Sequence, residues 1–230
     1  MDFTFLRETF VQLLSGLPLT LNLAATSVVL GLCGALVLAL MRGCGVAALE
    51  STARVYVFVV RGTPLLIQIF LVYYGLGQFR PFLQELGLWG VLRSPYWCAV
   101  LALAANTAAY GSEIIRGGIG AVPPGALEAA AACGMGPTLR LRRIVLPLAL
   151  RAALPAYGNE LILMVKATSL ASVITLMEVT GLAGKLIAQT YRAVEVFTCA
   201  GLIYLSLNFL LTRAVQMLEW RLNPERHGAN

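Results

Sequence analysis

Three long stretches of this chain carry no charged side chain, and most of their residues are apolar. They run from Thr9 to Met41, from Ser94 to Ser112 and from Val196 to Thr212. A helix needs about 20 mainly apolar residues to cross the hydrocarbon core of a bilayer. Because a spanning segment must satisfy its own backbone polar groups, these runs predict membrane-spanning helices.

Two further apolar windows contain isolated charges. Val55 to Phe79 is interrupted by Arg61, and Ala152 to Leu176 contains Glu160 and Lys166. Only 12% of the residues are charged, about half the share of a soluble domain. We therefore predict an all-α integral membrane protein with about five spans, followed by a polar tail at 223–230. The single domain covers 1–222, with spans at about 14–41, 55–78, 95–115, 152–176 and 196–219.

The first span is expected to stay in place, because its uncharged run is longer than a signal-peptide core and has no A-x-A cleavage pattern.

The connections between the predicted spans differ in their content of Lys and Arg. One side holds Arg42, Arg54, Arg116, Arg140, Arg142, Arg143, Arg151, Arg213, Arg221 and Arg226; the other holds Arg7, Arg80, Arg93, Lys185 and Arg192. The side with the excess is expected to be cytoplasmic. This places the N-terminus outside, the C-terminus inside and a long connection, 116–151, in the cytoplasm. Orientation, rather than binding of nucleic acid, then accounts for the net charge of +6.

That connection contains an alanine-rich stretch from Gly125 to Cys133, which predicts a short helix ending at Gly134. Within and after it stand Glu128-Ala129-Ala130, Gly134, Ile144, Leu146 and Pro147. Their spacing resembles the E-A-A, G, I-x-L-P signature of permease subunits of ATP-binding-cassette (ABC) importers. The resemblance implies a type I importer domain in which these residues contact the ATPase subunit through a coupling helix. The alternative is an amphipathic helix lying on the membrane surface.

The second span contains Arg61-Gly62-Thr63-Pro64-Leu65-Leu66-Ile67-Gln68, and 168–179 reads TSLASVITLMEV. Both are similar to the polar amino acid subfamily of these permeases, and the second is most like arginine importers. The resemblance implies an inner-membrane protein that imports a polar, cationic amino acid from the periplasm, with arginine favoured over histidine, glutamine or glutamate. Its partners would be a second, identical or homologous permease, an ATPase dimer holding ATP and Mg, a periplasmic binding protein and membrane lipid. Arg61 and Cys133 depart from the arginine-importer pattern. An ion-coupled secondary transporter is a weaker alternative, since no inverted repeat is visible.

Charged residues inside a membrane are costly, so they mark candidate functional sites. We predict a substrate site formed by Glu160, Asn159, Arg61, Thr63 and Gln68. Glu160 would attract a cationic group, whereas Arg61 or Thr63 would bind a carboxylate. Lys166 would lie nearer the subunit interface or the external exit. Gly62, Thr63 and Pro64 inside a span free backbone groups from the helical ladder, and such a discontinuity is a common place for substrate. The alternatives are that Glu160 forms an ion pair with Arg61 or Lys166 and that Pro64 makes a packing kink. Asn106, Tyr110 and Glu113 share one helical face; a polar seam between helices is the simpler interpretation for Tyr110 and Glu113.

Catalysis and metal binding are not expected. The cysteines are isolated, and the single His227 is in the tail. Gly184-Lys185 lacks both the first glycine and the Ser or Thr of a phosphate-binding loop. The chain is therefore predicted to bind no cofactor of its own and to provide a pathway rather than an active site.

Overall fold

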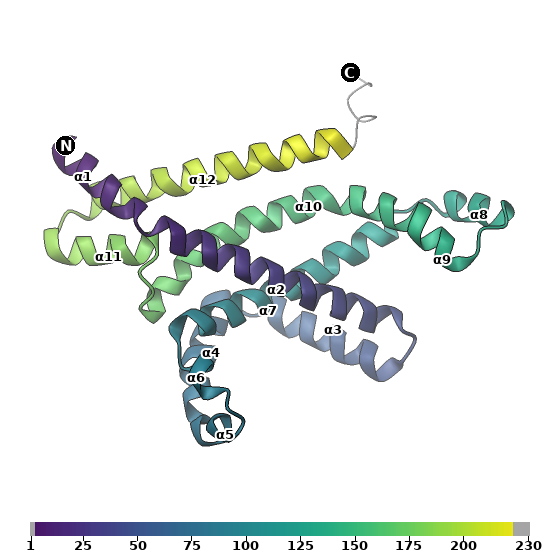
Figure 1. The fold of residues 1–230 in the computed structure, drawn as a ribbon, viewed down its shortest axis with the longest axis horizontal. Helices are drawn as coiled ribbons and strands as arrows, with labels where there is room; N and C mark the ends of the chain where they lie inside the picture. Colours follow the sequence, from purple (N-terminus) through teal and green to yellow (C-terminus); the bar gives the residue numbers. More distant parts are fainter. Residues whose placement is uncertain (1–2, 223–230) are drawn as a thin grey trace.

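A computed structural model describes residues 3–222 of the chain, and nearly all of them are helical (Figure 1). The helices are α1 (Phe3–Leu14), α2 (Leu17–Gly43), α3 (Ala47–Gly62), α4 (Leu65–Gln78), α5 (Arg80–Glu85), α6 (Trp89–Leu92), α7 (Pro95–Gly120), α8 (Pro124–Ala132), α9 (Pro137–Arg140), α10 (Leu146–Ala167), α11 (Val179–Thr190) and α12 (Ala193–Leu222). A π-helical turn at Leu141–Val145 precedes α10, and a 3-10 helix at Thr168–Ile174 follows it. The predicted tail at 223–230 lies outside the described residues.

By length and composition, the described chain has four apolar segments that could each cross a membrane, and a fifth if α3 and α4 form one broken span. The span predicted at about 55–78 is divided into two helices, because α3 and α4 meet at an angle of 106°. Thr63 and Pro64 at the break have extended backbone conformations. Proline disfavours helical conformation in the residue before it, which explains why the chain turns here.

The first apolar run is also divided, into α1 and α2 around Gly16. A Cβ atom on Gly16 would lie 2.8 Å from the carbonyl carbon of Glu178, so only glycine fits this approach to the segment before α11. Helix α1 packs with α11 and α12 in a cluster of buried residues that includes Leu13, Val179 and Val196.

The centre of the molecule is the crossing of α2 and α7 (Figure 1). Small residues allow the two helices to approach closely. A Cβ atom added to Gly31 would lie 2.6 Å from Cβ of Thr107, and one added to Gly34 would lie 2.8 Å from Cβ of Ala108. Such contacts between small residues are the usual means by which helices pack in a membrane.

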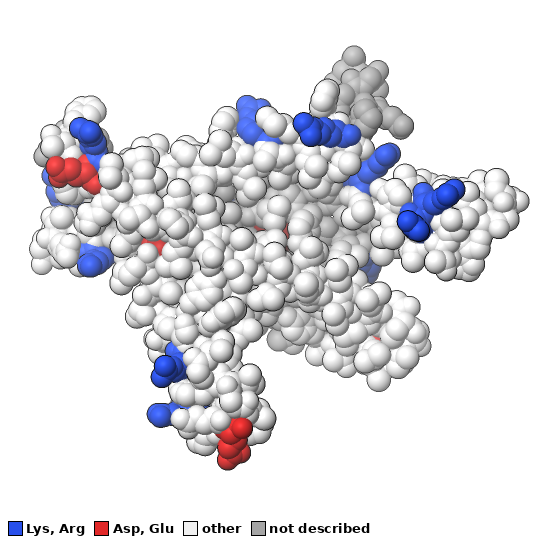
Figure 2. All heavy atoms as spheres, in the orientation of Figure 1, with Lys and Arg blue, Asp and Glu red and all other residues white. Residues whose placement is uncertain are grey.

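The two ends of the fold are formed by shorter elements. At one end α8 and α9 extend away from the bundle, and at the other α11 lies beside the start of α12 (Figure 1). The connection at the first end is shorter than the predicted 116–151, because α7 continues to Gly120 and α10 begins at Leu146. On the face shown in Figure 2, the surface between the ends is mostly white, that is, free of charged side chains. This distribution suits a protein embedded in a bilayer.

Candidate substrate cavity and coupling helix

The break between α3 and α4 is held by the side chain of Gln68. Its Nε2 donates hydrogen bonds to the carbonyl oxygens of Val60 at 2.7 Å and Thr63 at 3.1 Å, and to the Thr63 hydroxyl at 3.0 Å. Asn106 on α7 donates to Gln68 Oε1 at 3.3 Å. Backbone carbonyls freed by the break are thus satisfied by a side chain that also links the break to α7.

A cavity of about 530 Å³ lies beside this break. Its lining comes from the break, α7, α10 and the following 3-10 helix: Thr63, Pro64, Leu65, Asn106, Tyr110, Glu160, Leu163, Met164, Lys166, Ala167, Ser169 and Leu170. The volume is within the roughly 300–1,000 Å³ of small-molecule sites. Most of the wall is apolar, with a few polar groups spread among the four elements.

Glu160 is the buried charge of this cavity, with 7% of its surface exposed. Thr107 on α7 points its hydroxyl at Glu160 Oε1, with the two oxygens 3.4 Å apart. No ion pair of Glu160 is present within residues 3–222, which argues against the alternative of a pair with Arg61 or Lys166. An anionic group in an apolar, ligand-sized cavity can bind a cationic ligand, whose charge compensates the charge of the carboxylate.

The structure brings only part of the predicted substrate site together. Thr63 and Glu160 line the cavity, and Gln68 supports its wall through Thr63 and Asn106. Asn159 is exposed and does not line the cavity, because it points about 100° round α10 from Glu160. Arg61 is likewise outside the cavity: its guanidinium carbon lies 4.9 Å from the ring centroid of Tyr110, on the wall of neighbouring cavities.

Three residues that line the cavity were not included in the substrate site predicted from the sequence. Lys166, which was expected nearer the subunit interface or the external exit, lines the cavity together with Glu160. Tyr110 was assigned to a packing seam, and Asn106 was noted only as a polar residue on the same face. A polar i, i+4 pair inside an uncharged run was the available signal for both, but it is equally typical of helix packing.

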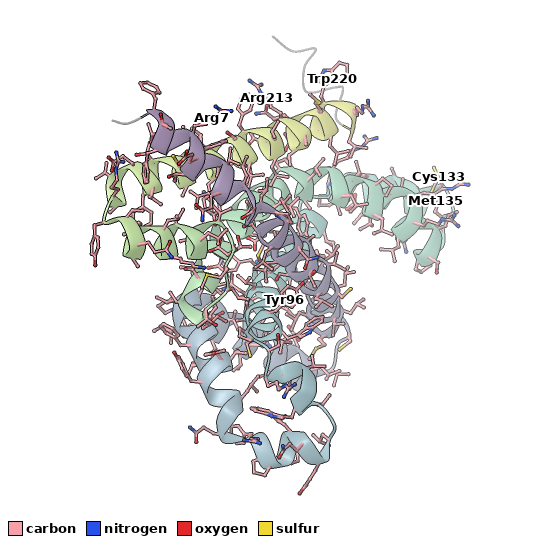
Figure 3. The ribbon with its side chains drawn as sticks, turned by 60° about the vertical axis from the view of Figure 1, so that its left-hand side comes forward. Arg7, Tyr96, Cys133, Met135, Arg213 and Trp220 are labelled. Carbon is pink, nitrogen blue, oxygen red and sulfur yellow. The ribbon has the colours of Figure 1, made fainter. Side chains whose placement is uncertain are left out.

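The predicted coupling residues lie on α8 and the segment after it. Glu128 and Ala129 are exposed, Ala130 is buried, and Gly134 ends the helix with a φ of +76°. The backbone N–H of Met135 donates to the Ala130 carbonyl at 3.1 Å, a closing bond typical of a glycine-terminated helix. Ile144 lies in the π-helical turn, and Leu146 and Pro147 begin α10. Cys133 and Met135 lie at the tip of this segment, away from the bundle (Figure 3).

Residues 31–224 match the family of binding-protein-dependent transport system inner membrane components. The chain belongs to this family. It is 58% identical over 227 residues to the octopine transport system permease protein OccM of Rhizobium radiobacter, covering 99% of this chain and 92% of that protein. It is 54% identical to the nopaline transport system permease protein NocM of Agrobacterium fabrum, covering 97% and 93% of the two chains. The arginine ABC transporter permease protein ArtM of Escherichia coli K12 is 47% identical over 167 residues, covering 72% and 74%.

The fold of this permease also matches solved structures. A crystal structure of an amino acid ABC transporter with histidines aligns with a TM-score of 0.86 at 35% identity, covering 96% of this permease and 99% of that chain. A methionine ABC transporter in an inward-facing conformation aligns at 0.69 and 21% identity, which supports the fold alone.

These matches confirm the predicted importer permease of the polar amino acid subfamily, with the helical membrane domain of a type I importer. The permease is a multi-pass inner-membrane subunit and is not itself an enzyme. As a component of an ABC importer, it works with ATPase subunits and a second permease subunit.

Proposed function

We propose that this permease carries an arginine-type substrate, either arginine itself or an N-carboxyalkyl arginine such as octopine, from the periplasm to the cytoplasm. The observation that carries the proposal is the buried carboxylate of Glu160, which lines a cavity of about 530 Å³ and has no ion-pair partner among residues 3–222. Support also comes from the names of the relatives, which include octopine, nopaline and arginine permeases. All three substrates have a guanidinium group.

In this proposal Glu160 binds the guanidinium group, since paired charge-assisted hydrogen bonds between a guanidinium and a carboxylate are strong and directional. The substrate carboxylate is bound elsewhere in the same cavity by Lys166, Thr63 or Ser169, all of which line it. Arg61, which we first expected in this role, does not line this cavity, and its guanidinium carbon lies 4.9 Å from the ring centroid of Tyr110.

The proposed cycle needs partners on both sides of the membrane. A periplasmic binding protein delivers the substrate, and an ATPase dimer that holds ATP and Mg drives alternating access. The ATPase contact is assigned to Glu128, Ala129, Ala130, Gly134, Ile144, Leu146 and Pro147, of which Glu128 and Ala129 are exposed on α8. These contacts would transmit closure of the ATPase dimer to α10, which begins at Leu146 and carries Glu160.

The test is uptake of labelled arginine and labelled octopine by cells that lack this permease and by cells in which it is restored. Unlabelled histidine, glutamine and glutamate serve as competitors. We expect loss and rescue of uptake for at least one guanidinium substrate, with weak competition by glutamine and glutamate. Unchanged uptake of both guanidinium substrates, together with loss of histidine, glutamine or glutamate uptake, would overturn the substrate assignment.

A further inference from the structure

Tyr110 lies on the wall of the substrate cavity and of two smaller cavities. Tyr110 lines the 530 Å³ cavity that contains Glu160, a second cavity of about 400 Å³ and a third of about 320 Å³. Along α7, Asn106 lines only the first cavity, whereas Glu113 lines the second and third. Because α7 continues from Glu113 toward α8, the smaller cavities lie between the substrate cavity and the predicted cytoplasmic end. We call these two cavities, both lined by Arg61, Tyr110 and Glu113, the exit vestibule.

Arg61 covers the vestibule side of Tyr110. Its guanidinium carbon lies 4.9 Å from the centroid of the tyrosine ring, within the range of a cation–π contact. Arg61 is in the last turn of α3, directly before the break at Thr63 and Pro64. The same short segment therefore supplies Thr63 to the substrate cavity and Arg61 to the vestibule.

The other charged groups of the vestibule are already paired. Glu113 accepts a hydrogen bond from Arg42 and two from Arg116, at 2.9 and 2.7 Å. Arg54 forms an ion pair with Glu50, in which Nη2 of the arginine lies 3.6 Å from Oε1 of the glutamate. The 400 Å³ cavity thus has three arginines and one glutamate on its wall. Arg61, which lies over the Tyr110 ring, is the arginine of this wall without a carboxylate partner among residues 3–222.

We infer that Arg61 is an anion-binding residue of the exit pathway and takes the carboxylate of the substrate as it passes Tyr110. The inference rests on the proposed function, in which Glu160 holds the guanidinium group. A net positive vestibule repels a guanidinium and attracts a carboxylate. The carboxylate end of the substrate therefore leads into the vestibule while the guanidinium end stays near Glu160. A substrate with an additional carboxylate, such as octopine, depends more strongly on Arg61 than arginine does.

A purely structural role for Arg61 makes a different prediction. A cation in the last turn of a helix interacts favourably with the helix dipole, and its contact with Tyr110 could simply hold the ring in place. Loss of that contact would change the import of every substrate by the same factor. The two roles can therefore be distinguished by comparing the import of a substrate with one carboxylate and a substrate with more than one. A larger loss for the second substrate indicates that Arg61 binds the carboxylate.

The experiment measures ATP-driven uptake of octopine and arginine into proteoliposomes that contain the whole importer, supplied with its binding protein. The variants are Arg61→Gln and Arg61→Lys. Arg80→Gln is the matched control, because Arg80 also lies over an aromatic ring, 5.8 Å from the centroid of Trp89, but lines none of these three cavities. We expect Arg61→Gln to lower the maximal rate for octopine by about tenfold or more, the factor for one charge-assisted hydrogen bond. The loss of rate for arginine is expected to be at least about threefold smaller than the loss for octopine. The rates of Arg61→Lys and Arg80→Gln are expected to stay within about threefold of the wild type.

Equal losses for both substrates, or no loss in Arg61→Gln, would overturn the inference. If the importer transports only one of the two substrates, an equal loss of uptake in Arg61→Gln and Arg61→Lys would overturn the inference. Binding of the same substrates to the purified permease–ATPase complex without binding protein tests the proposed function separately. Unchanged binding in Glu160→Gln refutes the proposed function. Weakened binding there, combined with an unchanged octopine-to-arginine uptake ratio in Arg61→Gln, refutes only the role of Arg61.

Discussion

The hydroxyl of Tyr204 donates a hydrogen bond of 2.6 Å to Oε2 of Glu178 and so joins α12 to the start of α11. Glu178 is completely buried. Its carboxylate also accepts from the backbone N–H groups of Thr180 and Gly181, at 3.0 and 2.8 Å, and thereby caps the first turn of α11. One carboxylate thus fixes the position of the short helix that follows the cavity-lining 3-10 segment.

Substitution of Tyr204 by Phe is expected to destabilise this end of the permease by about 1–3 kcal/mol, because a buried carboxylate loses a hydrogen-bond donor. The measurement is the melting temperature of the purified importer complex. Tyr191→Phe is the control, since Tyr191 is 90% exposed. Equal melting temperatures for the two variants would show that the Glu178–Tyr204 bond contributes nothing to stability.

Glu160→Gln is expected to weaken substrate binding to the detergent-purified complex by about tenfold or more, because glutamine keeps the size of the side chain but loses its charge. Isothermal titration with arginine and octopine measures the effect. The control is Glu85→Gln on the exposed helix α5. Assembly with the ATPase is expected to remain intact in both variants, and a loss of assembly in Glu160→Gln would instead indicate a structural role.

Gly31→Ala is expected to affect both stability and substrate binding. A Cβ atom at this position would lie 2.6 Å from Cβ of Thr107, whose hydroxyl points at Glu160. Overpacking of this kind costs about 1–3 kcal/mol, and any displacement of Thr107 changes the surroundings of the carboxylate. Gly43→Ala is the matched control on the same helix, because nothing lies within 4 Å of its added Cβ. Thermal unfolding and arginine titration of both variants provide the test.

Gly134→Ala is expected to reduce the amount of substrate imported per ATP hydrolysed. Gly134 has a φ of +76°, and this left-handed conformation costs a residue with a Cβ about 1–2 kcal/mol. The end of the coupling helix would therefore shift or fray. Gly136→Ala is the control: a Cβ at either glycine meets nothing within 4 Å, but Gly136 has a φ of −66°. The same coupling ratio in both variants would contradict a role for the Gly134 conformation.

Much of the architecture could be predicted from local sequence. The apolar runs predicted membrane helices, the alanine-rich stretch before Gly134 predicted the short helix now seen as α8, and Gly62-Thr63-Pro64 marked the discontinuity between α3 and α4. The structure brings the residues of the predicted substrate site together only in part. Glu160 and Thr63 do share a cavity, but Asn159 is exposed and Arg61 lies on the other side of Tyr110.

The sequence by itself determined which segments are apolar enough to span the membrane, where the chain can bend and which residues could form the coupling helix. These properties depend on side chains that are neighbours along the chain, so composition and spacing are sufficient to reveal them. Only the tertiary structure decided that Tyr110 lines both the cavity of Glu160 and the cavity of Arg61, and that Thr107 points its hydroxyl at Glu160. Those relationships follow from the 106° bend between α3 and α4 and from the close crossing of α2 and α7. Such geometry is set by packing between residues far apart in the chain, which a local pattern does not encode.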